Sequence, residues 1–127
     1  TYISPPFLPE AIVWEFIRRG HFEPNLERVR AELRARRDAM LDALALHFAR
    51  DASWSTPNGG YFVWLDLDGT DSNKLASRAE AAGVAFVAGS AFFPRGSGLG
   101  GSAARLAFSY EPPERIAEGI ELLASLR

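Results

Sequence analysis

Cysteine is absent from this chain of 127 residues, and lysine occurs once, at Lys74. Without cysteine there are no disulfides and no thiolate ligands for a metal, which fits a cytoplasmic protein. No apolar run approaches the roughly 20 residues that a membrane-spanning helix needs. A formal net charge of −2 creates no overall field that favours nucleic acid or an acidic membrane, so we expect neither as a partner.

The rest of the composition is ordinary for a globular protein. Hydrophobic residues make up 47% of the chain and charged residues 24%. The length predicts one domain that buries about two thirds of its unfolded surface. The chain starts at Thr1 with the hydrophobic stretch TYISPPFLPEAIVWEFI. Such a start is unusual for a free terminus, so we expect a piece of a longer protein.

Helical periodicity predicts four helices, at 10–20, 25–50, 70–83 and 112–126. The stretch before them, SPPFLP (4–9), is expected to be extended because each proline disfavours helix in the residue before it. The first helix is apolar nearly all round, which indicates packing against another surface. Arginines of the longest helix alternate with acidic residues, so we interpret that face as solvated and not as a nucleic-acid site.

Alternating patterns predict three strands, at 61–67, 84–89 and 105–110. The first has apolar residues on both faces, which predicts a strand covered on both sides. In the last, Leu106, Phe108 and Tyr110 are expected to face the core. The fold class is therefore an α/β (α+β) sandwich, with a small mixed or antiparallel sheet of about three to four strands packed with helices.

Several other motifs are explained by ordinary structural roles in loops, turns and helix caps. GSGLGG (96–101) has the G-x-G-x-x-G spacing, but it leads into a strand, whereas a dinucleotide site needs a helix N-terminus, so a mobile loop is favoured. His21 and His47 have no second ligand at metal spacing. The acidic residues after the first strand lack the calcium-loop pattern and are interpreted as turn and cap residues: Asp66, Asp68 and Asp71. No metal site is predicted.

Arg105 opens the last predicted strand, on the face that also carries Ala107 and Ser109. The small neighbours leave space in front of the guanidinium, whose planar fork matches the two oxygens of a carboxylate. From spacing alone, a ligand-binding role and a structural role are evenly balanced. In the structural role, Arg105 pairs with an internal acid or extends into solvent.

Four stretches in order carry a family resemblance: GHFEPNLERVRAELRARRDAML (20–41), PNGGYFVWLDL (57–67), AGVAFVAGSAFF (82–93) and ARLAFSYEPPERIAEGIELLA (104–124). Together they resemble the C-terminal part of class I/II aminotransferases, the fold-type I enzymes that use pyridoxal 5'-phosphate. The nearest branch is that of the 2-aminoadipate and broad-specificity enzymes, together with transcription regulators that contain such a domain.

The resemblance implies a role for particular residues of this chain. An arginine at the start of this late strand binds the substrate α-carboxylate in the family, and the motif places that role on Arg105. The turn at Gly59, Gly60 and Tyr61 is similar to the loop that forms one wall of the substrate cleft. Ala88 departs from the family pattern, which often has proline before this glycine, and this puts the local loop shape in doubt.

The resemblance also indicates what this chain lacks. Family enzymes hold pyridoxal 5'-phosphate as an imine on a lysine of the large domain, which precedes the region matched here. Lys74 lies at the start of a polar helix, so we expect no catalytic, cofactor-binding or metal-binding residue in this chain and no activity of the chain alone. Residues 1–20 are then a connecting segment and helix of the parent's large domain, and 21–127 the C-terminal small domain.

For the parent, the resemblance implies a homodimeric aminotransferase that moves an amino group from an amino acid to a 2-oxo acid. In such an enzyme this domain closes the active site against the large domain. Two alternatives stay open. One is an aminotransferase-like sensory domain of a transcription regulator, and the other is a stand-alone domain that binds a carboxylate ligand or a protein partner.

Overall fold

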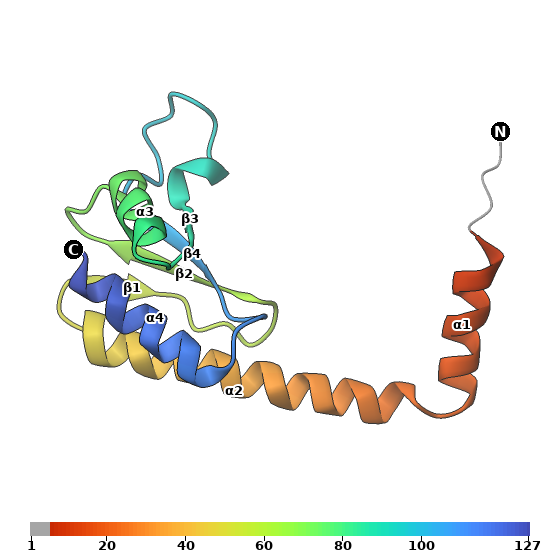
Figure 1. Ribbon diagram of the computed structural model, residues 1–127. Coiled ribbons are helices and arrows are strands. Elements are labelled where there is room, and N and C mark those ends of the chain that lie inside the picture. The colour runs from red at the N-terminus through yellow and green to blue at the C-terminus, as the bar shows by residue number, and fades with distance from the viewer. Residues whose placement is uncertain (1–5) are drawn as a thin grey trace. The chain divides into compact units, whose positions relative to one another are not determined.

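A computed structural model describes residues 6–127; residues 1–5, where the expected extended stretch begins, lie outside the described residues (Figure 1). The order of elements is α1 (Phe7–Arg18), α2 (Phe22–Phe48), β1 (Ala52–Trp54), β2 (Phe62–Leu67), α3 (Ser72–Ala81), β3 (Val87–Ala88), the 3-10 turn η1 (Gly89–Phe92), β4 (Ala103–Ala107) and α4 (Pro113–Ser125). The chain divides into two compact units, and the boundary lies between Glu32 and Leu33, inside α2. No helix of the described part is long and apolar enough to cross a membrane.

Helices α1 and α2 both begin earlier than their sequences predict. Pro9 and Pro24 each lie in the first turn of a helix. The sequence pattern treats them as breakers, but backbone N–H groups of a first turn have no partner inside the helix, so proline loses nothing there. The expectation of extended backbone is therefore wrong for residues 7–9.

Helix α1 is an apolar helix without a single buried residue. Its exposed side chains include Phe7, Leu8, Ile12, Val13, Trp14 and Ile17. On its polar side, Glu15 accepts hydrogen bonds from Arg18 and Arg19. The hydrogen bonds to Arg18 and then Arg19 lower the pKa of Glu15.

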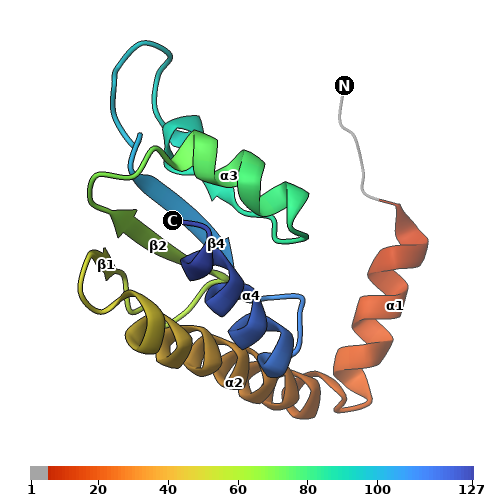
Figure 2. The same ribbon diagram turned by 60° about the vertical axis from the view of Figure 1, so that its left-hand side comes forward.

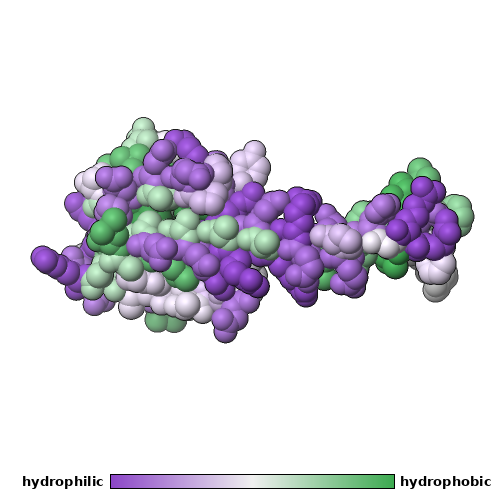
Figure 3. Space-filling view, turned by 90° about the horizontal axis from the view of Figure 1, so that it is seen from below, coloured by the Kyte–Doolittle hydropathy of each residue, from purple (hydrophilic) through white to green (hydrophobic). Residues whose placement is uncertain are grey.

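The early part of α2 is polar and carries ion pairs along its surface. Arg28 pairs with Glu32 at 2.7 Å and Arg30 with Glu27 at 2.9 Å. Figure 3 shows this stretch of helix as a hydrophilic surface. The alternation of charges thus produces pairs within the helix, which agrees with a solvated face.

The four strands form one antiparallel sheet in the order β1-β2-β4-β3. The sequence predicts three of these strands and misses β1, a short strand that pairs Ser53 with Asp66. β3 contains only two residues, because the chain turns at once into η1. The predicted α/β fold with a small sheet is confirmed.

Helices α2, α3 and α4 cover one face of the sheet, and α4 lies beside the C-terminal half of α2 in both views (Figures 1 and 2). The residues of the strands that face these helices are almost completely buried: Val63, Leu65, Leu67, Ala104, Leu106 and Phe108. They pack against Leu44 and Phe48 of α2, Leu75 of α3 and Leu123 of α4. Alternation along β2 and β4 therefore creates the core, as the sequence predicts.

The boundaries of β4 differ from the prediction. The strand begins at Ala103 and ends at Ala107, where Phe62 provides the last partner on β2. Ser109 and Tyr110 lie beyond the end of β2, and Tyr110 is 86% exposed, so its expected core position is wrong. Arg105 is the middle residue of the strand and not its first.

The face of the sheet opposite the helices is only partly covered. Phe62 is 41% exposed and Trp64 is half-buried. The expectation that both faces of β2 are covered is therefore wrong for this chain, and the face is open around Arg105.

Candidate functional site

Arg105 lies at the centre of the open face. In the register of the sheet its neighbours are Trp64 on β2 and Val87 on β3. Because alternate residues of a strand point to opposite faces, the burial of Ala104 and Leu106 in the core directs Arg105 away from the helices. The core therefore determines where the guanidinium points.

Two aromatic rings approach the Arg105 guanidinium from flanking elements. Its central carbon lies 4.0 Å from the ring centroid of Phe62 on β2 and 4.7 Å from that of Phe92 on η1. Trp64 supports Phe92 through an edge contact, with ring centroids 5.6 Å apart. A cation over an aromatic ring is stabilised by about 0.5–2 kcal/mol, depending on how much water is excluded. The rings thus restrict how a ligand can approach Arg105.

Arg105 has no ion pair with any carboxylate of residues 6–127. Its Nε atom is buried and has no hydrogen-bond partner among these residues. A buried polar group without a partner is unusual in a folded domain. The structural role that pairs Arg105 with an internal acid is therefore not observed in the described chain.

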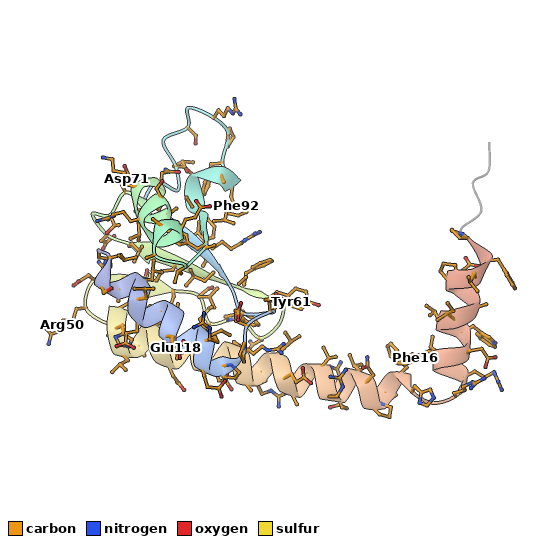
Figure 4. The ribbon with its side chains drawn as sticks, in the orientation of Figure 1. Phe16, Arg50, Tyr61, Asp71, Phe92 and Glu118 are labelled. Carbon is orange, nitrogen blue, oxygen red and sulfur yellow. The ribbon has the colours of Figure 1, made fainter. Side chains whose placement is uncertain are left out.

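The turn at Gly59, Gly60 and Tyr61 precedes β2 directly. Gly60 has a φ of +79°, in the left-handed region that glycine adopts most easily. The Tyr61 carbonyl accepts a hydrogen bond of 3.0 Å from the Phe108 backbone N–H, beyond the end of β4. The Tyr61 side chain is exposed (Figure 4). The sheet thus brings this turn to the end of β2 that carries Phe62.

The position of η1, and with it Phe92, depends on Gly89. A Cβ atom at residue 89 would lie 2.5 Å from the Ala103 Cβ and 2.7 Å from the Gly100 carbonyl oxygen. The Ser90 hydroxyl also bonds to the Asn73 side chain of α3 at 3.0 Å. Only glycine allows this approach, so Gly89 is required whether or not proline precedes it.

The end of the glycine-rich loop is anchored, although the sequence favours a mobile loop. The Gly101 carbonyl accepts from the Ser72 N–H at 2.8 Å, and the Ser102 carbonyl from the Leu67 N–H at 2.9 Å. The loop leads into β4, as predicted, and so it lacks the helix N-terminus that a dinucleotide site needs.

Lys74 lies on the first turn of α3, with its side chain 80% exposed and 3.5 Å from Asp71 Oδ2. Asp71 caps the helix by accepting from the N–H groups of Asn73 and Lys74, and the bond from Lys74 is the main reason that its pKa is lowered. An exposed, ion-paired amine does not fit a lysine that forms an imine with pyridoxal 5'-phosphate. Residues 6–127 also contain no cluster of side chains suited to a metal ion.

Sequence reasoning selects Arg105 but misses the rings around it. Phe62 and Trp64 could have been found, because they alternate with the core residues of β2 and therefore share the face of Arg105. Phe92 could not, because η1 has no periodic signal and its position depends on the contact between Gly89 and Gly100.

Comparison with known proteins identifies the family of the chain. A family model described as aspartate amino-transferase matches residues 17–126. The chain belongs to this aminotransferase family. An aromatic-amino-acid aminotransferase of Thermococcus litoralis is 37% identical over 91% of this chain and 27% of its own length. The structure of the α-aminoadipate aminotransferase of Thermus thermophilus, complexed with N-(5'-phosphopyridoxyl)-L-leucine, superposes with a TM-score of 0.83 and 37% identity over 95% of this chain and 31% of its own.

An uncharacterized HTH-type transcriptional regulator of Bacillus subtilis is also similar, at 32% identity over 89% of this chain and 23% of its own length. The chain spans less than a third of the length of each of these aminotransferase relatives. The family and the α/β fold of its small domain are thus established for this chain.

Proposed function

We propose that the chain is the small domain of an aminotransferase that uses pyridoxal 5'-phosphate, and that Arg105 binds the α-carboxylate of the amino acid or 2-oxo acid substrate. The observation that carries the proposal is the set of contacts around Arg105. Its guanidinium lies against two rings, its Nε is buried without a partner, and no carboxylate of the described chain neutralises it.

The rings limit the directions from which a ligand can reach the Arg105 guanidinium. Phe62 and Phe92 occupy positions beside the guanidinium carbon, which leaves the N–H groups at its edge for a ligand. A carboxylate matches that edge because its two oxygens accept two nearly parallel hydrogen bonds. The low polarity of the rings strengthens those bonds by excluding water.

Gly59, Gly60 and Tyr61 form one wall of the substrate cleft in this proposal. They are exposed and adjoin Phe62, so they lie at the edge of the face that carries Arg105. The domain closes over the substrate as a unit, which excludes water and fixes the position of the carboxylate relative to the reacting atoms.

The remaining machinery belongs to the rest of the parent protein. Because Lys74 does not fit the cofactor, the lysine and the phosphate-binding groups come from the large domain, and the chain alone is inactive. Residues 1–20 belong to the connection with that domain, which is consistent with the exposed apolar side chains of α1. The parent is a cytoplasmic homodimer in this proposal.

The test replaces Arg105 in the full-length protein. Arg105→Gln is expected to raise KM for the amino acid and lower kcat/KM by at least about 2 kcal/mol, or roughly 30-fold, because a charged hydrogen-bonded partner is lost. Arg105→Lys keeps the charge but not the planar fork, so about a tenfold loss is expected. The exposed Arg95, changed to Gln, is the matched control. An unchanged kcat/KM in Arg105→Gln contradicts the proposal.

The similarity to a transcription regulator supports a second candidate, in which the same domain senses an amino acid without turning it over. The same variants distinguish the two. For a regulator, Arg105→Gln weakens binding of the amino acid, and the full-length protein has no transaminase activity. For the enzyme, the unchanged protein has activity and the variant loses it.

A further inference from the structure

Two consecutive arginines of α2 reach the two loops at one end of the sheet. Arg37 Nη1 donates to the Pro57 carbonyl at 3.2 Å, and Arg36 Nη1 donates to the Ser109 carbonyl at 3.2 Å. Pro57 begins the turn that contains Gly59 and Gly60, and Ser109 follows β4. Neighbouring positions of a helix differ in direction by about 100°, which is why the two side chains reach different loops.

These contacts complete a chain of hydrogen bonds. Arg37 bonds to the turn at Pro57, and the turn bonds to the end of β4 through the Tyr61 carbonyl and the Phe108 N–H. Ser109, the next residue, bonds back to α2 through Arg36. The ladder between β1 and β2 stops at the bond from the Ser55 N–H to the Trp64 carbonyl. Residues 56–60 therefore lie outside the sheet, where a side-chain contact has the most influence on their position.

Arg37 is well suited to hold that position. Its Nε and Nη2 atoms donate to Asp38 Oδ1 at 2.8 and 2.6 Å, which orients the guanidinium and aims Nη1 at Pro57. The side chain is 24% exposed, so water competes less with these bonds than at the surface. Hydrogen bonds with a charged donor are roughly twice as strong as neutral ones.

We propose that Arg37, oriented by Asp38, is a positioning residue that holds the Gly59–Gly60–Tyr61 turn against the end of β4, with Arg36 holding the other side. The role is indirect, since Arg37 acts through the backbone of Pro57. This inference rests on the proposed function, in which the turn forms a wall of the substrate cleft. It adds a residue of α2, a helix on the opposite face of the sheet, to the determinants of substrate affinity.

The experiment compares Arg37→Gln, Arg37→Lys and Asp38→Asn with a matched control, Arg34→Gln, an exposed arginine of the same helix. In the full-length protein, hydrogen exchange of the Phe108 amide, which donates to the Tyr61 carbonyl, is expected to be about fivefold faster in Arg37→Gln than in the control. KM for the amino acid is expected to rise about fivefold with kcat changed less than twofold, because a wall of the cleft that is held less firmly weakens substrate binding without changing the reacting groups. Arg37→Lys, which can still reach a carbonyl, restores part of both effects.

The outcomes separate this proposal from the one it rests on. Unchanged exchange of the Phe108 amide in Arg37→Gln contradicts the positioning role, whatever the activity. Faster exchange with an unchanged KM also contradicts it, because the turn is then not part of the substrate site. If Arg37→Gln does not fold, Asp38→Asn decides through the same two measurements. An Arg105→Gln variant without effect contradicts the proposed function alone, since the exchange result stands by itself.

Discussion

The two faces of the sheet are built from the same strands but differ in burial and in charge. On the helical face Val63, Leu65 and Leu106 are buried, while on the open face Phe62 is exposed and Arg105 lies between aromatic rings. Alternation assigns neighbouring residues to opposite faces, so one short segment serves both stability and binding. The comparison teaches that the residues most informative about function are those that interrupt the apolar pattern next to the core.

The largest expected effect is on the free energy of unfolding, when one residue on each face of β2 is replaced by alanine. Leu65→Ala removes a fully buried side chain and is expected to lower the free energy of unfolding by about 2–5 kcal/mol. Phe62→Ala, on the open face, is expected to lower it by about 1 kcal/mol or less. Denaturant unfolding of the purified chain measures both. Equal losses would contradict the division of the sheet into a core face and a binding face.

A smaller effect is expected where the rings meet the arginine. Phe92→Leu keeps apolar volume but removes the ring 4.7 Å from the Arg105 carbon, so KM for the amino acid in the full-length protein is expected to rise about threefold. Phe93→Leu is the matched control, because its ring contacts Trp64 and not Arg105. If the two variants behave alike, the ring over Arg105 has no special role.

The smallest effect is expected at the cap of α3, which contributes neither to the packing of β2 nor to the contacts of Arg105. The pKa of Asp71 is lowered from 3.8, mainly by the hydrogen bond from the Lys74 N–H, so its charged form stabilises the folded state above that value. As the pH falls through the lowered pKa, this contribution is lost. Asp71→Asn keeps the cap without the charge. Its thermal midpoint is therefore expected to lie below that of the unchanged chain at pH 7, and the difference is expected to shrink as the pH falls below 3.8; a difference that does not depend on pH would contradict this.

The sequence predicts what depends on local periodicity and turn chemistry. The helices, strand β2, the inward direction of Leu106 and Phe108 and the outward direction of Arg105 all follow from such patterns. The ends of β4 do not, because Ala103 and Ala104 are weak strand formers that pair only because Asp66 and Leu65 lie opposite them. The wrong position predicted for Tyr110 has the same cause, since a strand ends where its partner ends.

The candidate site also combines a residue that the sequence predicts with contacts that it does not predict. Arg105 is recognisable as a charge that interrupts an apolar strand, whereas the contact of Phe92 depends on the close approach of Gly89 and Gly100, which are 11 residues apart in the chain. The hydrogen bonds of Arg36 and Arg37 join residues separated by 73 and 20 positions. Contacts of that range are properties of the folded chain, and no single segment of sequence contains them.

The most direct test of the central claim is a crystal structure of the full-length protein with its amino acid substrate bound. We predict that the α-carboxylate lies at the edge of the Arg105 guanidinium, with both oxygens within about 3 Å of its N–H groups and the rings of Phe62 and Phe92 still beside the arginine. A carboxylate bound to another cation, with Arg105 turned away from the substrate, would contradict it.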